Sequence, residues 1–162
     1  MKLFEALQTF NRLEEYIPFL DWIFEEKFPK EIWDNKNKIQ AYANKIKKLD
    51  GVSDSNFTYD AQKRIAFPEK NSYRQFNGLR IYMSNGDSMA RDWLRHIRNG
   101  IAHGLVQVIQ KNDNLFIELL DFSDKSQKNQ TAYFLIPIDF LLESKKIYDE
   151  KTKSFSKKKR GK

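Results

Sequence analysis

The chain contains no cysteine and only two histidines among its 162 residues. The lack of cysteine excludes disulfide bonds, zinc sites with cysteine ligands and enzymes that use a thiol nucleophile. No apolar run is long enough to cross a membrane, and the N-terminal segment, which soon carries several glutamates, does not read as a secretory signal peptide. We therefore expect a cytoplasmic protein that has no membrane partner.

The net charge of +7 comes from the C-terminal end of the chain. Residues 151–162 hold seven basic and no acidic residues, and this accounts for the whole excess, so residues 1–150 are formally neutral. We expect a single domain over residues 1–150 and a basic, disordered tail over residues 151–162. Such a tail attracts polyanions such as nucleic acids, but a solubilising tail has the same composition.

Apolar residues recur at helical spacing over most of the chain. The pattern predicts helices over residues 3–13, from Pro18 onward, over 31–49, 73–83 and 90–101, and from Pro137 to about residue 148. Residues 51–70 read as a long irregular connection. After Gly104 the pattern changes to that of strands, with candidates at residues 105–109, 115–120 and 131–135. The expected fold class is mainly α, with a small antiparallel β-hairpin or sheet after the helix over 90–101.

Both histidines lie at the end of that helix, in the run from Arg95 to Gly104. Residues 85–88 supply N-cap candidates for the helix. One face of the helix is apolar and should pack into the core: Ala90, Leu94, Ile97 and Ile101. At 100° per residue, three arginines form a stripe beside that face: Arg91, Arg95 and Arg98.

The spacing of Arg98 and His103 poses a geometric problem. In one unbroken helix the two side chains lie about 140° apart and could not share a small site. Asn99-Gly100 is a natural place for a helix to end or kink. Either the helix breaks there, or a second copy of the chain completes the site.

An arginine followed by four residues and a histidine, with Asn99 directly after Arg98, resembles the signature of the HEPN family. The resemblance implies a HEPN-like helical bundle that forms a homodimer, with a composite active site at the dimer interface. It implies a metal-independent endoribonuclease that uses no cofactor. Family members of this size commonly act as toxins in toxin–antitoxin pairs or as phage-defence effectors, so RNA and an antitoxin or other partner protein are the expected partners.

The residue types fit cleavage of RNA by its own 2′-hydroxyl. One group must take the hydroxyl proton and another must protonate the leaving 5′-oxygen, and histidine can serve in either role. A guanidinium offers paired donors to the charged phosphorane. Under the resemblance His103 is the acid/base, Arg98 the phosphate clamp, and Asn99 orients the histidine or the phosphate. Arg91, Arg95 and His96 are assigned to RNA binding, and His96 is expected to be solvated or at an interface.

Each of these residues also has a simpler structural interpretation. Arg98 could interact with the helix C-terminus or pair with a carboxylate, and His103 could be a turn residue without a role. Two other functions stay open. One is a catalytically inactive HEPN-like module that binds RNA, a nucleotide or a partner protein. The other is a DNA-binding accessory protein that uses the tail over residues 151–162.

Overall fold

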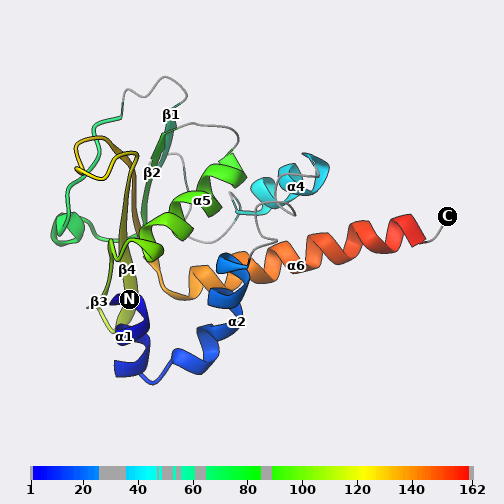
Figure 1. Ribbon diagram of the computed structural model, residues 1–162, viewed down its shortest axis with the longest axis horizontal. Coiled ribbons are helices and arrows are strands. Elements are labelled where there is room, and N and C mark those ends of the chain that lie inside the picture. The colour runs from blue at the N-terminus through cyan, green and yellow to red at the C-terminus, as the bar shows by residue number, and fades with distance from the viewer. Residues whose placement is uncertain are drawn as a thin grey trace.

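The computed structural model describes residues 2–25, 36–46, 48, 53, 56–60, 65–84 and 89–160 (Figure 1). The described elements, in chain order, are α1 (Lys2–Thr9), α2 (Leu13–Phe24), α4 (Lys36–Ile46), β1 (Phe57–Asp60), the 3-10 helix η1 (Ser72–Gln75), β2 (Arg80–Ser84), α5 (Met89–Ala102), β3 (Val106–Lys111), β4 (Asn114–Phe122), β5 (Gln130–Pro137) and α6 (Asp139–Arg160). Figure 1 shows α5 lying against the sheet and α6 extending away from it toward the C-terminus.

The described strands form one five-stranded sheet in the order β1-β2-β5-β4-β3. β1 pairs with β2 in parallel, and the other neighbours are antiparallel. Side chains alternate between the two faces, as the pleat requires. In β4, Ile117 and Leu119 belong to the core under the helices, whereas Leu120 belongs to a second apolar cluster on the opposite face.

This mixed sheet overturns the predicted fold class, so the description of a mainly α bundle with a small sheet is wrong. The three strands expected after α5 are present and antiparallel. However, the helix expected over residues 73–83 is absent: η1 covers its start and β2 its last four residues, and β1 lies within the expected irregular connection. In β2, Ile81 and Met83 are fully buried while Arg80 and Tyr82 are half-buried. Burial of every second residue is the pattern of a strand. Over so few residues the same apolar positions also fit a helical spacing, so the sequence pattern did not exclude a helix.

Three predicted helix boundaries also differ. The break after α1 falls at Asn11, whose left-handed φ of 56° is easier for asparagine than for most residues. α2 begins at Leu13 and runs through Pro18, where a helix start was expected. α6 continues to Arg160, past the end expected near residue 148. No glycine or proline interrupts the sequence of α6.

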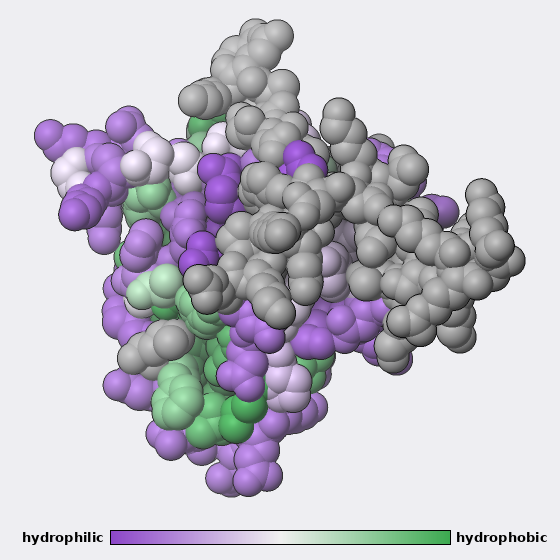
Figure 2. Space-filling view, turned by 45° about the vertical axis from the view of Figure 1, so that its right-hand side comes forward, coloured by the Kyte–Doolittle hydropathy of each residue, from purple (hydrophilic) through white to green (hydrophobic). Residues whose placement is uncertain are grey.

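Both faces of the sheet are apolar, and different parts of the chain cover them. The helices cover one face, and α5 brings to the core the four apolar residues expected there: Ala90, Leu94, Ile97 and Ile101. The other face carries Leu120, Tyr133 and Leu135, against which Phe67, Tyr73 and Phe76 of the segment before β2 pack. The large hydrophobic side chains that stay exposed among the described residues are Phe4, Phe10 and Ile17, and Figure 2 shows hydrophobic surface gathered at the lower end of the molecule. None of the described helices has the length and apolar character needed to cross a membrane.

α5 and β4 approach each other closely at Gly100. A Cβ atom added there would lie 2.5 Å from both Cγ and Cδ2 of Leu119, which is fully buried. No side chain larger than hydrogen fits without displacing the buried Leu119 side chain. Gly100 therefore sits inside the helix because the sheet requires it, and its lower helix propensity is outweighed by this contact.

Gly100→Ala is expected to lower the free energy of unfolding by roughly 1–3 kcal/mol, because overpacking exceeds the gain in helix propensity. Urea unfolding of the wild type and the variant measures this difference. Gly78→Ala is the matched control, since nothing lies within 4 Å of a Cβ at that position. If Gly100→Ala were as stable as the wild type, the Leu119 side chain would be able to rearrange without lowering the free energy of unfolding.

Candidate functional site

The site lies at the C-terminal end of α5, and the helix does not break at Asn99-Gly100. The Leu105 N–H donates to the Gly100 carbonyl at 2.8 Å. The Gly104 N–H donates to the Ile101 carbonyl at 3.1 Å, and Gly104 has a left-handed φ of 69°. These two bonds form a Schellman motif, so Gly104 ends the helix. Of the two geometric alternatives, the one that requires a break is therefore wrong.

His103 follows the last residue of α5 and is exposed. It lines a hollow of about 340 Å³ together with Leu105, Phe122 and residues 123–125 and 127 of the loop after β4. The loop also contributes a carboxylate. Hydrogen bonds from the Ser126 hydroxyl and then from backbone N–H groups hold the pKa of Asp124 below its ordinary value. The hollow thus places an accessible imidazole beside polar and apolar surface.

Arg98 is half-buried and has no carboxylate partner among the residues that the structure describes. Its Nε is buried and makes no hydrogen bond. Arg95 differs, because one of its terminal nitrogens lies 2.8 Å from Oδ1 of the buried Asp92. Arg98 therefore keeps its binding capacity for an external anion, whereas the Arg95 charge is partly compensated.

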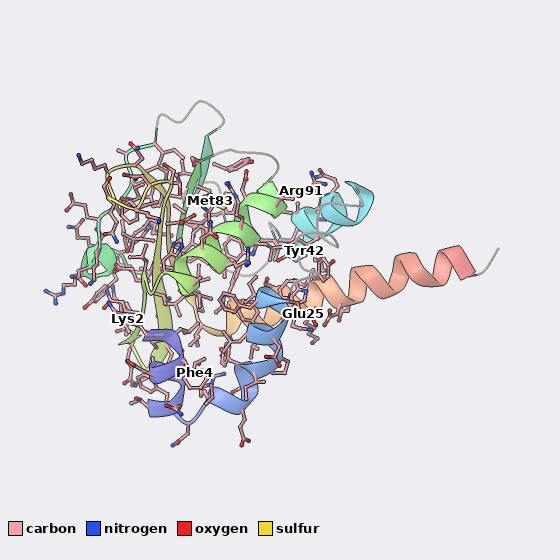
Figure 3. The ribbon with its side chains drawn as sticks, in the orientation of Figure 1. Lys2, Phe4, Glu25, Tyr42, Met83 and Arg91 are labelled. Atoms are coloured by element: carbon pink, nitrogen blue, oxygen red, sulfur yellow. The ribbon has the colours of Figure 1, made fainter. Side chains whose placement is uncertain are left out.

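The arginine stripe does not converge on His103. Figure 3 labels Arg91 at the far end of α5, near α4. Arg91 lies twelve positions before His103, about 18 Å along the helix axis, and Arg95 lies eight positions before it, about 12 Å. The predicted RNA-binding residues Arg91 and Arg95 therefore lie outside any small site around His103 of the same copy.

His96 is 1% exposed, so the expectation of a solvated or interface residue is wrong. Its Nδ1 lies 2.7 Å from Oδ2 of Asp121, and Nδ2 of Asn99 donates to the same oxygen at 3.5 Å. Asp121 is 3% exposed and lies on the helix-facing side of β4. The sheet covers this side of α5, so His96 offers no surface to RNA in the single chain.

The sequence carries a second match to the same spacing that sequence reasoning missed. Arg91 is followed by Asp92 and, five residues on, by His96, just as Arg98 is followed by Asn99 and His103. Burial separates the two matches, because His96 is enclosed and His103 is exposed. The signal that could have shown this is Asp121, an acidic residue at a core-facing strand position, which requires a buried partner.

The candidate site contains no cluster of metal ligands within the described part of the chain. At no point there do three or more His, Asp or Glu side chains come close enough to hold a metal ion. Arg98 can serve as an anion ligand, and His103, beside the Asp124 carboxylate, can serve as an acid or base.

The chain matches a known protein family. The family described as HEPN pEK499 p136 matches residues 7–157. Neither a curated protein nor a solved structure matches the chain. The matched range includes the whole sheet and α5, and therefore Arg98, Asn99 and His103.

Proposed function

Since the chain belongs to the HEPN pEK499 p136 family, we propose that it is a metal-independent endoribonuclease that acts as a toxin or phage-defence effector. HEPN domains are generally ribonucleases, so the family relation indicates an RNA-related module. The proposal adds the reaction, attack by the 2′-hydroxyl of RNA, and the residues that perform it: Arg98, Asn99 and His103.

The observation that carries the proposal is the state of Arg98. The Arg98 Nε is buried, so the terminal N–H groups of this half-buried guanidinium, which has no carboxylate partner among the described residues, are the donors left for an external anion. A phosphate group would satisfy them with parallel N–H···O bonds. The competing interpretation, a pair with a carboxylate, has no support among the described residues. Arg98 is thus well suited to hold the scissile phosphate.

The unbroken helix favours a site made by two copies. Because α5 continues past Arg98 to Ala102, helical geometry points that side chain and His103 in directions about 140° apart, so one copy by itself does not enclose a phosphate between them. A two-fold axis near the end of α5 would bring Arg98 of one copy to His103 of the partner subunit. The same axis would place both histidines at one phosphate.

Two histidines match the two proton transfers of the reaction. One His103 takes the proton of the 2′-hydroxyl while the 2′-oxygen attacks phosphorus. Arg98 stabilises the negative charge of the phosphorane that forms. The bond to the 5′-oxygen then breaks, and His103 of the partner subunit protonates that oxygen. The products are a 2′,3′-cyclic phosphate and a free 5′-hydroxyl. Asn99, whose amide reaches Asp121, fixes the end of α5 on the sheet.

Purified protein is expected to cleave mixed cellular RNA in the presence of EDTA and to leave 2′,3′-cyclic phosphate and 5′-hydroxyl ends. Sequencing of the fragments by a ligation method specific for cyclic ends measures both the cutting and its chemistry. RNA that is bound but not cut would contradict the proposal and favour an inactive RNA-binding module. Cleavage that leaves 5′-phosphate ends would contradict the 2′-hydroxyl mechanism.

A further inference from the structure

A larger cavity adjoins the hollow of His103. It has a volume of about 450 Å³ and lies against β3, β4 and the start of β5, on the face of the sheet away from α5. The two spaces share three lining residues, Leu105, Phe122 and Gln127. A strand of RNA whose phosphate lies at His103 could therefore place a neighbouring group in this cavity.

The lining of the cavity is apolar at its centre and basic at its edge. Leu105, Leu120 and Phe122 come from the second apolar cluster. The exposed charged residues of the lining are Lys2, which Figure 3 shows beside β3, Lys70, Lys128 and the acidic Glu69, so the exposed charge is basic on balance. A flat heteroaromatic group attached to a phosphate chain suits such a surface, because aromatic and aliphatic side chains stack on its faces while lysines attract its phosphates.

Two glutamines give the cavity a defined polarity. The Gln130 side-chain N–H groups donate to the backbone carbonyls of Pro68 and Ala132, at 2.8 and 3.2 Å. The Gln107 side-chain N–H groups donate to Asn71 and Glu118, both at 2.8 Å. Since these donors face oxygen atoms of the protein, the amide oxygens are the atoms left to serve a ligand. The cavity therefore offers hydrogen-bond acceptors.

The buried Glu118 does not compete for the ligand. Its two oxygens accept hydrogen bonds from the backbone N–H groups of Asn71 and Tyr73, from Gln107 and from the Tyr133 hydroxyl. Burial, and then the bond to Glu118, hold the pKa of Tyr133 above its ordinary value, so this hydroxyl stays a donor. A carboxylate with four donors is satisfied, and it fixes Gln107 in its orientation.

We propose that this cavity binds a nucleobase that carries an exocyclic amino group, namely adenine, cytosine or guanine, in preference to uracil. The amino hydrogens face the amide oxygens of Gln107 and Gln130, where uracil would present its carbonyl oxygens instead. The inference rests on the proposed function, since it makes the base a neighbour of the cleaved phosphate. The same base chemistry could also come from a free nucleotide.

The test measures binding of 3′-AMP, 3′-CMP, 3′-GMP and 3′-UMP by titration calorimetry, with inorganic phosphate as the reference. We expect the three amino-bearing nucleotides to bind at least about fivefold more tightly than 3′-UMP, the effect of one good hydrogen bond. Gln130→Met removes an acceptor and should bring this ratio toward one, and Gln107→Met is the second variant should the first fold poorly. Gln110→Met, an exposed glutamine of β3 outside the cavity, should leave the ratio unchanged.

Equal binding of all four nucleotides, or binding no tighter than that of phosphate, overturns the inference whether or not the protein cleaves RNA. A ratio that collapses in Gln130→Met but not in Gln110→Met supports it. Mapping of RNA cleavage sites then separates the two sources of the base. A preference for cuts beside A, C or G that Gln130→Met relaxes supports the RNA substrate. Nucleotide discrimination in a protein that does not cut RNA overturns the substrate role and identifies a free nucleotide.

Discussion

His103→Ala is expected to lower the rate of RNA cleavage at least about a hundredfold, because it removes the proton-transfer group from both copies. His103 is exposed, so the variant should unfold at a urea concentration close to that of the wild type. Initial cleavage rates in EDTA, measured beside the unfolding midpoint, separate loss of chemistry from loss of fold. Gln110→Ala, a change at an exposed residue on β3, is the control and should keep full activity. Full activity of His103→Ala would mean that another group performs the acid/base step.

Mixing His103→Ala with the wild type tests whether one site uses both histidines. If it does, mixed dimers are inactive, and activity falls to about one quarter in an equal mixture after subunit exchange, because only that share of dimers keeps both histidines. If each site uses a single histidine, activity falls only to about one half. The second result would contradict the two-histidine mechanism while leaving His103 catalytic.

The part of the site that could be predicted from sequence is the part set by one helix. The spacing of Ala90, Leu94, Ile97 and Ile101 fixed the core face of α5, and all four are buried. The helical spacing of apolar residues predicts the buried face reliably here because α5 packs against a single large apolar surface. The arginine stripe beside that face followed from the same period.

The end of the helix depended on contacts that the local sequence does not contain. Gly100 and Gly104 are both reasonable helix ends by composition. Gly100 is in fact required by Leu119, which belongs to a strand that comes later in the chain. Whether the helix ends at Gly100 or at Gly104 decides between a site within one copy and a site shared by two copies. The sequence alone therefore left both alternatives open.

The two histidines show the same limit more sharply. His96 and His103 stand at the same spacing from Arg91 and Arg98, and no local pattern separates them. What separates them is Asp121, which β4 brings to the buried side of α5. The sheet itself was underestimated because β1 and β2 pair in parallel through a long connection, and such non-local pairing has no short-range sequence signal.

The buried pair of His96 and Asp121 should dominate the stability of the region around α5. His96→Leu is expected to lower the free energy of unfolding by about 2–4 kcal/mol, because it leaves a buried polar group without its main partner. Among the described residues, the Asp121 side chain would then keep the Phe122 N–H at 2.9 Å and the Asn99 amide at 3.5 Å as its partners. Urea unfolding measures the loss.

A double-mutant cycle distinguishes this pairing from simple packing. Asp121→Leu alone should cost a similar amount, since it leaves a buried imidazole, whereas the double variant removes both polar groups and should cost clearly less than the sum, by at least about 1 kcal/mol. Additive losses would contradict a direct interaction between the two side chains.

The rate of RNA cleavage provides the second readout. Well below its unfolding temperature, His96→Leu should retain most of the activity that His103→Ala loses, because His96 contributes to the fold and lies out of reach of RNA. If folded His96→Leu proved inactive, the buried histidine would have to be counted in the chemistry, and the division of roles between the two histidines would fail.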